Sequence, residues 1–414
     1  LTPARRLPAP ARRFALRAVA AGTLATGMLM MTATAGWAAP PQAPALREAA
    51  AAASDSFYTP PSPLPAGQPG DLIRYRSAPS PDPGTTAWQV LYLSTTVSGS
   101  PAAVSGTVIV PDSPYAGPRP VVAYGSGTQG WGDQCAPSVE MASGTYDEQF
   151  AVSNLLAKGW AVAVTDYPGL GTPGDETYAV GIAEGYAVLD VMRAATHLPG
   201  AGLSGRAPMA IEGYSQGGGA AGWAAQLQPS YAPAMHLVGV AAGGTPANLQ
   251  AVAANINGSA FFAFLGGAAI GFNAAYPSRH LLSGLTPSGQ AALARLDTMC
   301  QDTALPLYAG QRIENYTAGH INPISEPRWQ TVLTANDLGG MKPAVPLLQY
   351  HGLADEVIPY QVEAALHRQY CAQGVTTQLT AFPGDHVLTQ VEAQPAVVNW
   401  ISARLAGTPA PANC

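Results

Sequence analysis

Short apolar runs alternate with longer amphipathic stretches along most of the chain. The apolar runs read as buried strands, and they lie at 119–124, 160–166, 207–212, 237–242, 345–350 and 377–382. Helical patterns occupy 146–158, 178–196, 217–227 and 361–370, and an alternating pattern at 91–110 with a turn at 97–100 predicts a hairpin. Because strands that are apolar throughout are buried on both faces, the pattern predicts an α/β fold. Its mostly parallel sheet would be covered by helices on both sides.

About 100 residues separate the strand that ends near 242 from the one that starts near 345. A connection of that length without structure of its own is uncommon. It contains an apolar stretch at 260–272 and helical patterns at 286–300 and 323–335. We therefore predict a core formed by 71–242 and 343–414, with 243–342 inserted as a helical cap.

The apolar stretch at 260–272 is a candidate wall for an apolar ligand. Phe261, Phe262 and Phe264 lie there among glycines and alanines, which suits an apolar and adaptable surface. Together with Tyr214, these phenylalanines are the predicted substrate-binding residues. The alternative is that the stretch forms only the core of the cap itself.

The first 38 residues have the composition of a signal peptide. Five arginines without an acidic residue are followed by a small apolar stretch at 18–31 and by small residues at 32–38. The apolar stretch is short for a membrane span, although a retained membrane anchor is the alternative. Residues 39–70 are rich in alanine and proline, so we expect them to lie over the surface or to stay loose. The chain is therefore predicted to be secreted.

Charged residues make up only 11% of the chain, well under the usual quarter. Removal of the signal peptide would leave 14 basic residues against 25 acidic ones, a net charge of −11. An acidic protein without a basic patch is a poor ligand for nucleic acids and anionic membranes. We therefore expect no nucleic-acid partner.

The chain has four cysteines, Cys135, Cys300, Cys371 and Cys414. An even number in an exported chain predicts two disulfides, for which three pairings exist. A zinc site is the rival interpretation, but no C-x-x-C spacing supports it. We therefore expect two disulfides and no metal.

The most informative motif is Gly-Tyr-Ser-Gln-Gly at 213–217. This G-x-S-x-G pattern lies between a predicted strand and a predicted helix, which is the context of a nucleophile elbow. The turn lifts the hydroxyl of Ser215 off the sheet edge, and the helix N-terminus directs partial positive charge at any oxyanion formed there. We predict that Ser215 is a catalytic nucleophile. The alternative is a solvent-facing serine in a turn.

A catalytic serine needs a base, and the base needs an acid to orient it. With this elbow, the acid and then the base follow the serine along the chain. Asp355 comes after the strand that ends near 350 and is the predicted acid, with Glu356 as its close competitor. His386 follows the last strand and is the predicted base. We expect His351 to brace the acid loop and His367 to lie on the surface of its helix.

The tetrahedral intermediate of such a reaction needs two backbone donors. The amide of Gln216, directly after the nucleophile, is the first. The glycine-rich loop at 125–130 is expected to supply the second, with Thr128 as first candidate and Gly127 and Gln129 close behind. The alternative for this loop is a plain glycine-rich turn.

Several of these segments together resemble the secretory lipase family of α/β-hydrolases over roughly 75–405. The matching segments are 135–138, 166–171, 213–217, 351–359 and 384–386. The resemblance implies hydrolysis of carboxylic esters, a helical cap over an acyl tunnel, and the catalytic roles already given to Ser215, Asp355 and His386. It also implies the disulfides Cys135–Cys300 and Cys371–Cys414, which is the pairing that we favour.

Two positions depart from the family pattern. A yeast member has glycine after the nucleophile, where this chain has Gln216. The same enzyme has an acidic residue in the oxyanion loop, where this chain has Gly-Ser-Gly-Thr-Gln at 125–129. Both donors are backbone groups, so the catalytic logic is unaffected. The second donor and the preferred acyl length stay open.

The sequence thus predicts a secreted serine hydrolase that cleaves acyl esters through an acyl-enzyme, without a metal or organic cofactor. We expect an acyl-ester or lipid substrate, transient contact of the cap with a lipid surface, and a monomer. An acyltransferase on the same triad is the alternative, with an alcohol in place of water. A non-catalytic binding protein is a third interpretation, against which the three intact triad positions argue.

Overall fold

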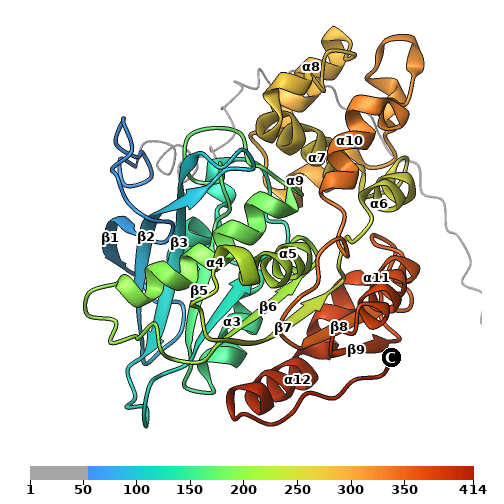
Figure 1. The fold of residues 1–414 in the computed structure, drawn as a ribbon. Coiled ribbons are helices and arrows are strands. Elements are labelled where there is room, and N and C mark those ends of the chain that lie inside the picture. Colours follow the sequence, from blue (N-terminus) through green and yellow to red (C-terminus); the bar gives the residue numbers. More distant parts are fainter. Residues whose placement is uncertain (1–54) are drawn as a thin grey trace, which may run out of the picture. The chain divides into compact units, whose positions relative to one another are not determined.

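The computed structural model describes residues 55–414. The predicted signal peptide and the first part of the alanine- and proline-rich segment lie outside the described residues. Within the described part, nine strands form one sheet in the order β1-β2-β3-β5-β4-β6-β7-β8-β9 (Figure 1). The strands are β1 (Leu72–Ala78), β2 (Thr85–Thr95), β3 (Pro101–Pro111), β4 (Val121–Gly125), β5 (Ala161–Thr165), β6 (Met209–Tyr214), β7 (Leu237–Gly243), β8 (Leu347–Gly352) and β9 (Thr377–Phe382).

The sheet is antiparallel at one edge and parallel elsewhere. β1, β2, β3 and β5 pair antiparallel, whereas β5, β4, β6, β7, β8 and β9 pair parallel. Every residue of β4, β5, β6 and β8 is buried. This confirms the α/β class and the mostly parallel sheet expected from the apolar runs.

Helices cover both faces of the sheet. α4 and α5 share one apolar cluster with Val121 and Ala123, while α3 and α12 share the other with Val122 and Tyr124. Neighbouring residues of β4 therefore serve opposite layers, as the two-residue period of a strand requires. The helices are α2 (Pro137–Ser143), α3 (Gln149–Leu156), α4 (Gly181–His197), α5 (Gln216–Tyr231), α6 (Leu249–Ile256), α7 (Phe262–Ala275), α8 (Pro287–Leu296), α9 (Gln301–Tyr308), α10 (Pro327–Ala335), α11 (Tyr360–Ala372) and α12 (His386–Leu405).

All the regular elements in the long connection between β7 and β8 are helices. Its helices α6 to α10 lie together in the upper part of Figure 1. They share a small apolar cluster, which includes Phe272, Trp329 and Leu333, with Val180 and Ala183 at the start of α4. We refer to residues 249–335 as the helical segment.

Four elements differ from the sequence prediction. β1 and α2 were not anticipated, and β2 begins at Thr85 rather than near 91. α4 begins at Gly181 rather than at 178, because Ala179 just before it has a φ of 60° that a helix cannot contain. Part of the alanine- and proline-rich segment is also anchored, since Phe57 and Tyr58 are buried against Leu91 of β2.

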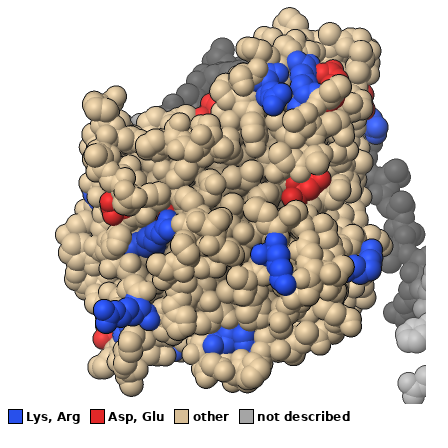
Figure 2. All heavy atoms as spheres, in the orientation of Figure 1, with Lys and Arg blue, Asp and Glu red and all other residues tan. Residues whose placement is uncertain are grey.

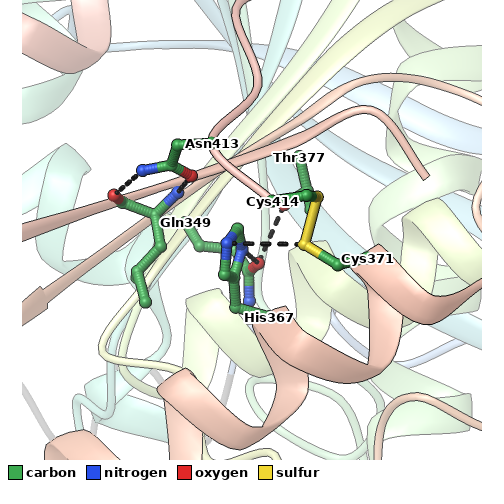
Figure 3. Close-up of a disulfide and its surroundings, with 7 residues drawn as sticks. Gln349, His367, Cys371, Thr377, Asn413 and Cys414 are labelled. Atoms are coloured by element: carbon green, nitrogen blue, oxygen red, sulfur yellow. Dashed lines mark hydrogen bonds between the residues drawn. A yellow bond between two sulfur atoms is a disulfide. The ribbon is translucent and has the colours of Figure 1, made fainter. Parts of the chain in front are cut away.

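The structure joins Cys135 to Cys300 and Cys371 to Cys414, with Cα–Cα distances of 5.4 Å in both disulfides. His367 lies beside the second disulfide (Figure 3), and its prediction as a surface residue is wrong. Only 8% of His367 is exposed, because α11 presents it to β8, where its Nδ1 donates to Oε1 of Gln349 at 3.0 Å.

Charged side chains are sparse on the surface as well as in the sequence. On the face shown in Figure 2, lysine and arginine side chains stand singly or in small groups between wide uncharged areas. Among residues 55–414, none of the helices has the length and apolar character needed to cross a membrane.

Candidate active site

Ser215 occupies a sharp turn between β6 and α5. Its φ of 59° and ψ of −123° lie in a region that residues with a side chain rarely adopt. Its amide donates to the carbonyl of Gly243 at 3.0 Å, which fixes the turn to the neighbouring strand. The hydroxyl is thereby held above the carboxyl end of β6, as the elbow motif predicts.

The glycines of the motif are required by close backbone contacts. A Cβ atom at Gly213 would lie 2.1 Å from the carbonyl oxygen of Gly217. A Cβ atom at Gly217 would lie 1.8 Å from the carbonyl oxygen of Gly125. Both distances are far below contact, so β4, β6 and α5 can approach this closely only with glycine at both positions.

The structure brings together the three residues predicted as nucleophile, base and acid. Nε2 of His386 lies 2.9 Å from Oγ of Ser215, and Nδ1 of His386 lies 2.6 Å from Oδ2 of Asp355. His386 begins α12, whose N-terminus is capped by the side chain of Asp385. Glu356, the competitor for the acid role, instead accepts the backbone amide of His386 at 3.1 Å.

Asp355 is held as an anion. Its other oxygen accepts the amides of Val357 and Ile358 at 3.0 and 2.8 Å. Burial acts to raise the pKa of Asp355, but hydrogen bonds from His351 and His386 outweigh burial and hold this pKa well below its usual range. The carboxylate can therefore stabilise an imidazolium on His386.

His351 braces the acid loop, as expected from its position. Nε2 lies 2.8 Å from the carbonyl of Ile358 and 3.2 Å from Oδ2 of Asp355, and Nδ1 lies 3.3 Å from Glu363. Burial opposes the charged form, yet the carboxylates of Asp355 and Glu363 prevail and raise the pKa of His351 to about 10. A second, cationic histidine therefore stands behind the catalytic acid.

Gln216 and the loop after β4 lie where the oxyanion donors are expected. As the first residue of α5, Gln216 has an amide that no carbonyl within the helix can accept. The amide of Gly127 already donates to Oε2 of Glu148 at 2.9 Å, which removes Gly127 from the candidate donors. Thr128 and Gln129 stay as the candidates, and the hydroxyl of Thr128 bonds to the hydroxyl of Tyr178 at 2.8 Å.

A largely apolar cavity opens beside Ser215. It is lined by Phe264 and Phe272 of α7, by Trp329 and Leu333 of α10, and by residues of α4, α5 and α6. Polar groups at its wall are few, and Glu184 and Asn336 are among them. An apolar cavity that contains the nucleophile suits an acyl chain.

The predicted substrate-binding residues separate in the structure. Phe264 lines the cavity that holds Ser215, but Phe262 lines a neighbouring cavity, and Phe261 lines neither of the two. Successive helical side chains point about 100° apart, so neighbouring phenylalanines of α7 cannot share one wall. Tyr214 is buried away from the cavity, stacks on Tyr350 and donates to the carbonyl of His386 at 2.8 Å.

Sequence reasoning missed two carboxyls beside the nucleophile. Glu176 and Glu184 both accept hydrogen bonds from Nε2 of Gln216, each at 2.9 Å. Burial raises the pKa of Glu184 to about 8 and holds that of Glu176 well above its usual range. The available signal was Glu184 itself, an acid among Gly181, Ala183 and Gly185 in a helix expected to be amphipathic.

Within residues 55–414, a single cluster of side chains has the spacing of metal ligands: His367, Cys371 and Cys414. Two of its three members form a disulfide, which removes their thiolates as ligands.

Comparisons with known proteins identify the family of the chain. The sequence profile of a family described as secretory lipase matches residues 136–413. Lipase 10 of Candida albicans is 31% identical, covering 87% of this chain and 82% of that protein. The secreted triacylglycerol lipase LIP7 of Malassezia globosa is 29% identical, covering 85% and 79%. A Mycobacterium tuberculosis protein called probable inactive lipase MT1628 is 30% identical, covering 86% and 82%.

Among solved structures, Candida antarctica lipase A in its closed state superposes with a TM-score of 0.80. The superposition covers 88% of this chain and 90% of that one at 24% identity. This likeness confirms the α/β-hydrolase fold expected from the sequence.

Proposed function

The chain belongs to the secretory lipase family of carboxylic ester hydrolases, and from that premise we propose that it cleaves acyl esters, triacylglycerols among them, with Ser215 as nucleophile. One observation carries the proposal. The hydrogen-bonded chain from Ser215 through His386 to Asp355 opens directly onto an apolar cavity. Family membership alone is insufficient, because one relative of similar identity is named as probably inactive.

The first half of the reaction forms an acyl-enzyme. Nε2 of His386 takes the proton of Ser215 as Oγ attacks the ester carbonyl, and Asp355 keeps the proton on Nδ1 and stabilises the imidazolium. The carbonyl oxygen becomes an oxyanion, which the amides of Gln216 and Thr128 bind. The intermediate then collapses, and His386 gives its proton to the leaving alcohol.

The second half returns the free enzyme. A water molecule loses a proton to Nε2 of His386 and attacks the acyl carbonyl, and the same two amides bind the new oxyanion. Collapse returns the proton to Oγ of Ser215 and releases the fatty acid. Every proton transfer uses groups of this chain, and the complete reaction consumes only the ester and one water molecule.

The helical segment is proposed to be the cap over the acyl chain. Phe264 and Phe272 of α7 and Trp329 of α10 line the cavity together with residues of α4 and α5, so the acyl chain would lie between the segment and the core. The segment also exposes Leu307 and Ile321, at 43% and 58%, which suits transient contact with a lipid surface. We further propose that the chain is secreted, because its relative from Malassezia globosa is named as a secreted lipase.

The test is hydrolysis of p-nitrophenyl esters from acetate to palmitate by the purified protein and by S215A. We expect activity that falls by a factor of about 10⁴ or more in the variant, because the nucleophile is lost. Ser143, an exposed serine at the end of α2, offers a matched control, and S143A should retain full activity. Equal activity of S215A and the unmodified protein would disprove the role of Ser215.

The same assay separates hydrolysis from acyl transfer. With an added alcohol acceptor, a hydrolase releases mainly the free acid, whereas an acyltransferase releases mainly the new ester. A preference for long chains would support the acyl path along Phe264 and Phe272. A maximum at acetate or butyrate would restrict the substrate to small esters and leave the triad unaffected.

A further inference from the structure

The side chain of Gln216 is held between two buried carboxyls. Nε2 of Gln216 donates to Oε1 of Glu176 and to Oε1 of Glu184, each at 2.9 Å, so both of its hydrogens are engaged. The same oxygen of Glu184 also accepts the amide of Ala179 at 2.9 Å. Both glutamates are only 1% exposed.

This arrangement lies at the point where charge develops in the proposed reaction. Gln216 follows the nucleophile, and its backbone amide is the first proposed oxyanion donor. Glu184 lines the same cavity as Ser215 and Gln216. Both carboxyls can therefore affect the oxyanion site through the side chain of Gln216. Glu184 can also affect it through its own charge, because it lines the cavity.

Burial favours neutral carboxyls and outweighs the hydrogen bonds from Gln216 and Ala179, which favour the charged form. The titratable groups that act on Glu184 come from the segment after β5, namely Tyr167, Glu176 and Tyr178, and Asp297 of the helical segment acts on Glu176. All of these groups are neutral or acidic. In the described part of the chain, neither glutamate forms an ion pair with a lysine or arginine.

We propose that Glu176 and Glu184 are positioning residues that hold Gln216 at the oxyanion site while protonated, and that ionisation of Glu184 switches the reaction off at alkaline pH. The proposal rests on the proposed function. A carboxylate on this wall would repel the oxyanion, in a cavity where charges are poorly screened. The ionised Glu184 would also compete with the oxyanion for the N–H groups of Gln216.

The test is the pH dependence of kcat and KM for p-nitrophenyl butyrate between pH 5 and 9.5, corrected for spontaneous hydrolysis. With the pKa of Glu184 at about 8, the kcat of the unmodified protein should fall about tenfold by pH 9. E184Q keeps the size and the acceptor oxygen of the side chain but cannot ionise. Its kcat should stay level to pH 9, and KM should change little in either protein.

Glu212 provides a matched control. It is also a fully buried glutamate that accepts from a glutamine amide, Gln394 at 2.6 Å, and burial raises its pKa to about 8. It faces α12 on the side of the sheet opposite to α4 and the cavity. E212Q should therefore keep the alkaline loss of kcat seen in the unmodified protein.

Two results would overturn the inference while leaving the proposed function intact. One is an active E184Q protein with the same alkaline loss as the unmodified protein. The other needs no variant: an alkaline loss of activity that coincides with loss of the folded signal in circular dichroism. Absence of serine-dependent esterase activity at every pH would instead reject the proposed function, and the inference with it.

Discussion

The disulfide between Cys371 and Cys414 fastens the last residue of the chain to α11. Besides the disulfide, the tail is held by Asn413, whose backbone amide donates to Thr377 at 3.2 Å. The side chain of Asn413 pairs with the backbone of Leu379 at 2.9 and 2.8 Å. Replacing both cysteines by serine removes the covalent link and leaves these hydrogen bonds in place.

The size of the effect follows from the loop that the disulfide closes. Its cysteines are 43 residues apart in the sequence, and the chain-entropy relation gives about 4 kcal/mol of stabilisation for such a loop at 25 °C. The three hydrogen bonds of Asn413 are worth about 1 kcal/mol each at most, because they lie at the surface. The disulfide should therefore dominate the attachment of the tail.

We expect C371S/C414S to lower the free energy of unfolding in urea by about 4 kcal/mol at pH 7. Activity on p-nitrophenyl butyrate at 25 °C should stay unchanged, because the contacts of Ser215, His386 and Asp355 do not involve the tail. N413A, with the disulfide intact, is the matched control and should cost less than about 2 kcal/mol. A loss below about 1 kcal/mol in the double variant would refute the loop-closure reasoning for this tail.

The other disulfide should behave differently. Cys135 and Cys300 are 165 residues apart, which corresponds to about 5 kcal/mol in the same relation. The link also joins the loop after β4 to the start of α9, and Gly130 pairs there with Cys300. C135S/C300S should therefore lose esterase activity as well as stability, since this loop carries the second proposed oxyanion donor. Equal activity in both double variants would argue against that role of the loop.

Three further predictions concern single residues. H351Q removes the cationic brace behind the catalytic acid, and kcat on a soluble ester should fall at least about tenfold while KM changes little. G217A would bring a methyl group to 1.8 Å from the carbonyl of Gly125, so thermal unfolding should show a loss above about 3 kcal/mol or no folded protein. Burial raises the pKa of Glu212 to about 8, so the folded state binds its proton more tightly than the unfolded state. This contribution to the free energy of unfolding is complete below about pH 4 and is lost as pH rises through 8, by about 1.4 kcal/mol per pH unit. E212Q should therefore reduce the pH dependence of the free energy of unfolding, measured in urea, over that range.

The parallel strands and the order of the triad could be read from the sequence because both are local. Each of these strands is a short apolar run; Ser215 follows β6 directly, Asp355 lies in the loop that follows β8, and His386 comes at the end of the loop that follows β9. Strands that end at one edge of a sheet bring the residues after them together, whatever the intervening sequence. The disulfide pairing, in contrast, came only from the resemblance, because spacing does not distinguish among three pairings.

Residues whose role depends on distant partners could not be read in this way. The amide of Gly127 is taken by Glu148, which lies 21 residues further on. His367 is buried because β8 presents Gln349 to it, and no helical pattern reveals that contact. Phe261, Phe262 and Phe264 looked alike in sequence, yet only the rotation of α7 decides which of them reaches the nucleophile.

The close packing of α4 against α5 accounts both for the departure at Gln216 and for the acid Glu184 beside it. A Cβ at Gly181 would lie 2.0 Å from the Trp223 ring, so glycine allows α4 and α5 to approach closely. That approach carries Glu184 of α4 into contact with the first residue of α5. A buried carboxyl without a donor costs about 1–3 kcal/mol or more. The side-chain amide of Gln216 supplies a donor to Glu176 and a second donor to Glu184, which also accepts the backbone amide of Ala179. With glycine after the nucleophile, both acids would lack that donor, so the glutamine and the two carboxyls make physical sense only as a set.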